Sequence, residues 1–274
     1  MIRYAIILFS LIFSNNLLKA QSITFSSYEK LRTIPGTYTS FSIDNLGNIY
    51  LLSASNQLKK LNQKGDSVAV FNDVKKFGEA TLVDVSNPTK IILYYKNFAT
   101  IVMLDGMLQQ KNTIDLRRKN IFRVKAVSLS YDGKIWLYDE IDHTLKKIDE
   151  QGEVLLKTSD LRQIFNQSIA PVKIVDQNQH VYLYDPQQGV YVFDYYGAFK
   201  NRIDITGWNN LRIADKHVFG NDSTSIYSYE IPVFKYTRTV LPAALSGYRQ
   251  IISNNHFFYG LHSAGLDIIK LAGN

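Results

Sequence analysis

The pattern that decides the fold occurs twice with little change, as Phe41-Ser-Ile-Asp-Asn-Leu-Gly-Asn-Ile-Tyr50 and as Val127-Ser-Leu-Ser-Tyr-Asp-Gly-Lys-Ile-Trp136. Each copy has alternating apolar residues, then a polar turn with glycine, then a second apolar run that ends in an aromatic residue. A third apolar run and a further glycine follow, as in Gln57–Gly65 and Thr144–Gly152. Repeats of about forty residues built from strand, turn and strand are typical of β-propeller blades.

Weaker copies extend this pattern along the chain. Two of them replace the turn glycine, with Pro88-Thr89 and with Asn178-Gln179. Together the copies make six units, which begin near residues 39, 81, 125, 171, 210 and 249. No proline-rich or glycine-rich linker divides them, so we expect one domain rather than two.

The sixth unit is incomplete, because its third strand, Asp267–Leu271, is followed by only three residues. Near the other end of the chain, Ser22–Leu31 has the character of a strand and belongs to no unit. A ring closed by this segment would leave no free sheet edge between its first and last blades. We therefore predict an all-β fold, a six-bladed β-propeller in which the N-terminal strand joins the last blade.

Residues 1–20 have the features of a secretory signal peptide. Arg3 precedes the apolar run Tyr4–Phe13, and Ala20 supplies a small residue before a cleavage point at Gln21. The run is too short to span a bilayer, and a helix within the fold is the alternative. We expect residues 21–274 to be a single propeller, exported to the periplasm and without a transmembrane segment.

The composition excludes several classes of protein. The chain has no cysteine, which excludes disulfides, thiolate catalysis, cysteine zinc sites and a lipoprotein anchor. Without residues 1–20, which carry Arg3 and Lys19 and no acidic residue, the net charge falls from +7 to +5. This mild excess is compatible with an acidic partner or an anionic lipid, and is too small to indicate nucleic-acid binding.

The units Ile43–Tyr50 and Leu129–Trp136, each followed by a third strand that ends in glycine, resemble the NHL-type six-bladed propellers of secreted Bacteroidota proteins. The chain departs from that pattern in four of its six units, which lack the usual glycine. A single propeller of this size is similar to the small accessory subunits of the type IX secretion apparatus. That resemblance implies a scaffold at the outer membrane, facing the periplasm and held there by a protein partner.

Three histidines, His180, His217 and His256, occupy one repeat position in consecutive units, directly before the second strand. Three such residues resemble a set of metal ligands. However, metal–nitrogen bonds are about 2.0–2.1 Å long, whereas packed sheets lie about 10 Å apart. We therefore interpret these histidines as polar turn residues, and we predict neither a metal nor a cofactor.

Acidic residues cluster at Asp139–Asp142 and at Asp149-Glu150. Two carboxyl groups held about 5–10 Å apart can hydrolyse glycosides. The neighbouring residues are rich in lysine and give no reason for a raised pKa, so we favour solvated turns. The sequence contains no Gly-x-Ser-x-Gly elbow and no phosphate-binding glycine loop, and we name no catalytic residue.

Basic residues recur near the start of the innermost strand in successive units, where the strands converge on the mouth of the central channel. Such residues could clamp a carboxylate or a phosphate, and a scattered basic rim is the alternative. Trp208 lies in a connection between units and could either anchor a partner or pack against the next blade. The candidate ligand- or partner-binding residues are therefore Arg123, Lys125, Lys173, Trp208, Arg212 and Arg249.

These features favour a non-enzymatic, protein-binding scaffold in the cell envelope, plausibly an accessory component of an outer-membrane protein secretion complex. The alternative is an enzyme or a sensor that acts on an acidic glycan, a peptide or a small anion at the channel mouth. The sequence leaves open whether the chain has catalytic activity, which partner it binds, and its oligomeric state.

Overall fold

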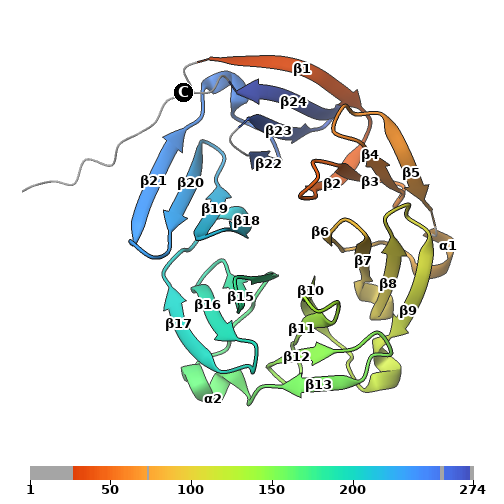
Figure 1. Ribbon diagram of the computed structural model, residues 1–274, viewed down its shortest axis with the longest axis vertical. Coiled ribbons are helices and arrows are strands. Elements are labelled where there is room, and N and C mark those ends of the chain that lie inside the picture. Colours follow the sequence, from red (N-terminus) through yellow and green to blue (C-terminus); the bar gives the residue numbers. More distant parts are fainter. Residues whose placement is uncertain (1–26, 73, 254–255, 272–274) are drawn as a thin grey trace, which may run out of the picture.

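A computed structural model describes residues 27–72, 74–253 and 256–271. In it the chain forms six four-stranded antiparallel sheets around a central axis, which confirms the predicted six-bladed β-propeller (Figure 1). Five of the blades are single meanders, whose strands follow one another from the axis outward. The innermost strands of all six blades begin within two residues of the predicted unit starts.

Each blade runs from an innermost strand at the axis to an outermost strand at the rim. In that order, blade 1 contains β2 (Tyr38–Ile43), β3 (Ile49–Ser53), β4 (Leu58–Leu61) and β5 (Ser67–Phe71). Blade 2 contains β6 (Leu82–Asn87), β7 (Lys90–Tyr95), β8 (Thr100–Asp105) and β9 (Gln110–Asp115). Blade 3 contains β10 (Val124–Leu129), β11 (Ile135–Asp139), β12 (Thr144–Ile148) and β13 (Val154–Lys157).

Blade 4 contains β14 (Lys173–Gln177), β15 (His180–Asp185), β16 (Gly189–Asp194) and β17 (Phe199–Ile203). Blade 5 contains β18 (Asn209–Ala214), β19 (His217–Asn221), β20 (Ser225–Glu230) and β21 (Lys235–Val240). Blade 6 contains β22 (Gln250–Ser253), β23 (Phe257–His262), β24 (Gly265–Leu271) and β1 (Tyr28–Pro35). Short helices lie between the strands, namely α1 (Val74–Phe77), α2 (Leu161–Phe165), η1 (Lys96–Phe98), η2 (Leu116–Lys119) and η3 (Ala243–Leu245).

The ring closes as predicted, because the N-terminal strand β1 pairs antiparallel with β24 as the outer strand of blade 6. This strand begins later than the predicted segment, of which residues 22–26 lie outside the described residues. Asp267 of β24 fixes the closure by accepting hydrogen bonds from Thr33 and Tyr248, each at 2.7 Å. Lys30 forms an ion pair with the same carboxylate at 2.9 Å.

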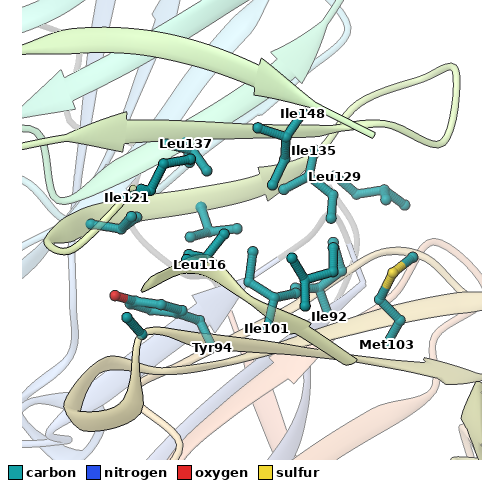
Figure 2. Packing of buried hydrophobic residues seen from close by; sticks show 14 residues of the cluster. Ile92, Tyr94, Ile101, Met103, Leu116, Ile121, Leu129, Ile135, Leu137 and Ile148 are labelled. Atoms are coloured by element: carbon teal, nitrogen blue, oxygen red, sulfur yellow. The ribbon is translucent and has the colours of Figure 1, made fainter. Parts of the chain in front are cut away.

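The hydrophobic core lies between neighbouring blades, which explains why one blade alone could not bury its faces. Figure 2 shows the cluster between blades 2 and 3, where Ile92 and Ile101 face Leu129, Ile135 and Leu137. Every residue of β11 is buried, since this strand is covered on both faces. The corresponding cluster between blades 5 and 6 is smaller, with five buried apolar residues.

The antiparallel blades give the ring two different faces. Turns between the first and second strands, and between the third and fourth strands, lie on one face, which we call the hairpin face. Connections between blades, together with the turns between the second and third strands, lie on the opposite face, which we call the connection face. Contacts between neighbouring turns follow this division: Asn178 donates to the Asp215 carbonyl across two hairpin-face turns.

Candidate functional site

The basic residues predicted at the channel mouth do not form one continuous site. Arg123 and Lys125, at the start of β10, share the carboxylate of Glu140, at 3.9 and 3.8 Å. Arg249 precedes β22, is exposed, and donates to the carbonyl oxygen of Tyr38. These three side chains therefore already have acceptors on the protein, and their role in binding a partner or ligand stays a prediction.

Lys173 and Arg212 lie on the neighbouring inner strands β14 and β18. Arg212 lies 4.2 Å above the ring of Phe219 and donates to the carbonyl oxygen of Ser253 in blade 6. Burial lowers the pKa of its guanidinium. Burial also lowers the pKa of Lys173; the negative charge of Asp84 acts to raise that pKa, and the positive charge of Arg212 acts to lower it further. Lys173 therefore lies within electrostatic reach of both side chains.

Trp208 packs inside the fold. It is 7% exposed, stacks on Tyr227 with 5.1 Å between the ring centroids, and contacts Tyr236. A Cβ on Gly220 would lie 2.7 Å from the indole, so the glycine makes room for it. This arrangement is the packing alternative that the sequence left open, and a role of Trp208 in binding a partner stays a prediction.

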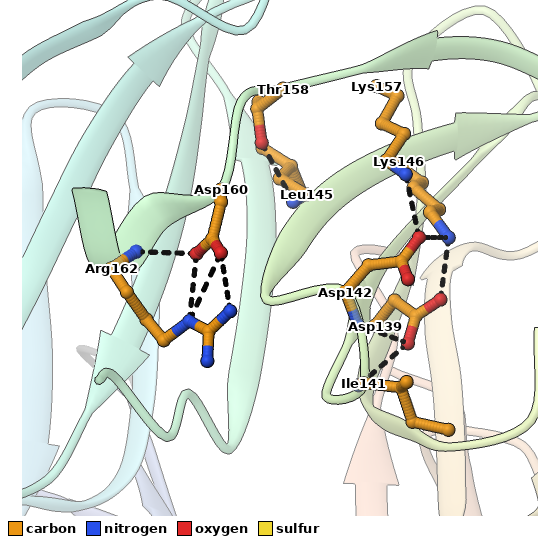
Figure 3. A network of polar contacts seen from close by, with 9 residues as sticks. All are labelled: Asp139, Ile141, Asp142, Leu145, Lys146, Lys157, Thr158, Asp160 and Arg162. Atoms are coloured by element: carbon orange, nitrogen blue, oxygen red, sulfur yellow. Dashed lines mark hydrogen bonds and ion pairs between the residues drawn. The ribbon is translucent and has the colours of Figure 1, made fainter. Parts of the chain in front are cut away.

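The acidic cluster of blade 3 is not the solvated turn that the sequence favours, because Asp139 is buried. Figure 3 shows Asp139, 1% exposed, paired with the buried Lys146 at 2.6 Å. Asp142 accepts from the same lysine at 2.8 Å and from Lys157 at 2.7 Å. These hydrogen bonds lower the pKa of Asp142 to about 2. A general acid needs a raised pKa, so this cluster stabilises the blade and does not resemble a glycosidase pair.

The surroundings of two of the histidines are aromatic. His180 and His217 begin β15 and β19, and each contacts an aromatic residue of its own strand. In the part of the chain that the structure describes, no three histidine, aspartate or glutamate residues form a group that could hold a metal ion. None of its helices is both long and apolar enough to cross a membrane.

Sequence reasoning missed the most unusual surface of the molecule. The six most exposed large apolar side chains among the described residues all lie in turns of the hairpin face. Turn residues are normally polar or glycine, and this was the signal that could have been read from the sequence. We call this set the apolar turn set: Leu46 (65% exposed), Met107 (56%), Tyr131 (71%), Tyr196 (88%), Val233 (59%) and Phe234 (77%).

Tyr131 is held in place by its neighbours even though its outer surface is exposed. Its ring stacks on Tyr195, with 4.7 Å between centroids, and the ammonium group of Lys147 lies 5.4 Å from its centroid. The Tyr195 hydroxyl donates to Asp176 at 2.7 Å, and so does the Trp136 indole at 3.0 Å. Blades 3 and 4 thus present a fixed aromatic surface next to Tyr196.

No protein-family model matches this chain, and no curated protein matches its sequence. Among solved structures it is similar to the Pan2 WD40 domain of Neurospora crassa, with a TM-score of 0.66 and 8% identity over 92% of this chain and 98% of that one. It is also similar to a catalytically inactive virginiamycin B lyase from Staphylococcus aureus with quinupristin (TM-score 0.64, 10% identity, 90% and 100% covered). A streptogramin B lyase gives a TM-score of 0.58 at 13% identity, covering 85% and 78%. One of these proteins is a WD40 domain and the others are lyases, so the likeness identifies the fold, a β-propeller, and not an activity.

Proposed function

We propose that this chain is a protein-binding scaffold rather than an enzyme, and that its partner docks on the hairpin face. The observation that carries the proposal is the apolar turn set. Large apolar side chains at such exposure lose contact with water when a partner covers them, and this gain drives association. Five of the six blades contribute a member, so the partner would contact most of the ring.

The fixed aromatic residues support a protein partner. Tyrosine is enriched at the centres of protein interfaces, where a few residues supply most of the binding energy. The stacking of Tyr131 on Tyr195 reduces the side-chain entropy that binding would cost. A charged pair, Lys90–Glu150, also lies between two hairpin-face turns. Protein interfaces combine such polar groups with apolar ones.

We further propose that the partner is a protein of the cell envelope, and that the scaffold belongs to an outer-membrane protein secretion complex. The support comes from the signal-like residues 1–20 and from the similarity of a single propeller of this size to the small accessory subunits of the type IX secretion apparatus. The alternative is a ligand-binding or catalytic role at the channel mouth. It is favoured by one observation: Lys173 on β14 and Arg212 on β18 are cations that form no ion pair within the described residues.

A mild-detergent pull-down of the tagged protein from envelopes, read by mass spectrometry, tests the proposal. The variant combines Tyr131→Ser with Tyr196→Ser, and the control is Phe122→Ser, a 54% exposed residue of the connection face. We expect a stoichiometric partner with the parent protein and the control, and its loss with the double variant. Thermal unfolding of all three proteins shows whether the fold is kept. A partner that binds the double variant as well as the parent would contradict docking on the hairpin face.

A further inference from the structure

Arg212 and Lys173 are cations near the axis of the ring that form no ion pair among the described residues. A charge removed from bulk water is costly unless an opposite charge accompanies it. The buried Lys146 follows this rule, with two carboxylates within 2.8 Å, whereas the buried Lys60 donates instead to the carbonyl oxygen of Gly106 at 2.8 Å. Arg212, which is half-buried, therefore needs an explanation, and the exposed Lys173 is a second positive charge within electrostatic reach of it.

The guanidinium of Arg212 is fixed but only partly used. Phe219 supports one of its faces at 4.2 Å, and one nitrogen donates to Ser253. A guanidinium has five N–H donors, so most of its hydrogen-bonding capacity is free. Arg212 also lines a small pocket between blades 5 and 6, together with the amide side chains of Asn210 and Asn221. The Asn210 amide donates to the side-chain oxygen of Asn221, and the Asn221 amide donates to the carbonyl of Asp222, each at 3.0 Å, so the guanidinium is the main donor that remains on this side of the ring.

Lys173 lies in the channel itself. It belongs to blade 4, yet it lies within electrostatic reach of Asp84 from blade 2 and of Arg212 from blade 5. Only the centre of the ring brings those three blades together. Its side chain is exposed to solvent by surface area, although the protein around it lowers the pKa of its ammonium group.

Asp84 does not serve as the counter-ion of Lys173. One of its oxygens accepts from the backbone N–H of Leu129 at 2.7 Å and from the Ser128 hydroxyl at 3.0 Å. The other oxygen accepts from the backbone N–H of Ser86 at 2.8 Å. The carboxylate is thus held against blade 3 and attracts Lys173 only at longer range.

We propose that Arg212 and Lys173 form a binding site for a small oxyanion, a carboxylate or a phosphate group, in the wall of the central channel. The free edge of the guanidinium offers two parallel donors, which match two oxygens of either group. The ammonium group of Lys173 would supply the second positive charge. This site lies away from the apolar turn set, so it can be present whether or not a protein docks on the hairpin face.

Isothermal titration calorimetry with sodium phosphate and with sodium acetate, at an ionic strength held constant with sodium chloride, tests this proposal. We expect binding of at least one anion by the parent protein. Arg212→Gln and Lys173→Gln should each weaken that binding about tenfold or more, because each removes a charge-assisted hydrogen bond. Arg118→Gln is the matched control, since Arg118 is 85% exposed and pairs with Asp115 outside the channel. Lys173→Gln also guards against misfolding, because it alters an exposed side chain.

The calorimetry distinguishes a specific anion site from a general effect of surface charge. Tighter binding of phosphate identifies a phosphate site, tighter binding of acetate identifies a carboxylate site, and either result supports the proposal when the channel variants weaken it and the control does not. No measurable binding of either anion would overturn it. Equal weakening by all three variants would also overturn it, since it would show a general effect of surface charge. Thermal unfolding in the same buffers gives a second readout, in which a bound anion raises the midpoint.

Discussion

The interface between blades 2 and 3 and the interface between blades 5 and 6 have the same place in the repeat and differ in how they are filled. Fourteen buried apolar residues form the first, and five form the second, counted among the described residues. A polar pocket lined by Asn210 and Arg212 lies beside the second. The difference teaches that this ring is not uniformly packed, and that the junction with fewer buried apolar residues contains Arg212, which has no carboxylate partner among the described residues.

The two junctions also differ in the charged residue at one equivalent position of the inner strand. Asp84 and Arg212 lie on the inner strands of blades 2 and 5, and each is paired in register with the third residue of its second strand. Both reach the inner strand of the following blade. Asp84 accepts hydrogen bonds there from the Leu129 N–H and the Ser128 hydroxyl, whereas Arg212 donates to the Ser253 carbonyl and has no carboxylate partner in the part of the chain that the structure describes. The charged side chain at the junction of blades 2 and 3 therefore has several hydrogen-bond partners in the next blade, and the one at the junction of blades 5 and 6 has a single partner there.

The largest effect is expected for a cavity in the well-packed junction. Leu137→Ala removes a side chain that is fully buried between blades 2 and 3, and should lower the free energy of unfolding by about 3–4 kcal/mol. Ile251→Ala, at the pocket between blades 5 and 6, should cost about 2 kcal/mol, because the pocket already interrupts its packing. Urea unfolding measures both. Equal losses would show that the two junctions are packed alike.

Asp84→Ala should lower the free energy of unfolding by about 2–3 kcal/mol, since the Leu129 N–H would lose its acceptor in the interior. Asp84→Asn keeps one acceptor oxygen and should cost less. Urea unfolding of the two variants gives the comparison. A neutral Asp84→Ala would mean that this carboxylate does not join blades 2 and 3.

Ring closure supplies a third junction whose stability depends on pH. Burial by itself would raise the pKa of Asp267, but hydrogen bonds from Lys30, Thr33 and Tyr248 outweigh burial and lower the pKa to about 2. Because the folded pKa lies below the unfolded value of about 3.9, the stabilisation is complete above pH 4–5 and is lost as the pH falls toward 2. Asp267→Asn should therefore cost about 2 kcal/mol at pH 7.

Measuring the unfolding free energies of the parent and of Asp267→Asn at low pH provides the control for this prediction. The difference in unfolding free energy between the parent and the variant should shrink between about pH 4 and pH 2, because the parent then loses its negative charge as well. Chemical unfolding at several pH values measures this difference. A gap that stays constant down to pH 2 would contradict the role of the charged carboxylate.

The smallest effect is expected at Arg212. Arg212→Met removes a hydrogen bond to Ser253 and also an unpaired charge, and the two changes act in opposite directions. The free energy of unfolding in chloride buffer should therefore change by less than about 0.5 kcal/mol, while anion binding is lost. A loss as large as that of Asp84→Ala would show that Arg212 serves to join blades 5 and 6.

Most of the fold could be predicted from sequence because the signals are local. The alternation in stretches such as Phe41–Tyr50 sets the strands, and the unmatched N-terminal strand predicts the closure. The burial of charged side chains could not be predicted. Strand alternation places Lys146, and not Lys147, on the same face of the hairpin as Asp139. It does not show that a neighbouring blade covers that face, so the buried Asp139–Lys146 pair was not foreseen.

The closure of the ring has a consequence for the order of folding. Thr33 and Asp267, which are joined by a hydrogen bond, are 234 positions apart. Contacts between such distant residues form slowly, because the loop between them must lose its freedom first. On the ribosome, β1 emerges early and waits with an unpaired edge until β24 is made, whereas the strands of blades 1 to 5 can pair as they appear and bury their faces when the next blade follows. The protein therefore spends its synthesis as an open arc with one exposed strand, and a chaperone that covers β1 would act before any blade of the ring is complete.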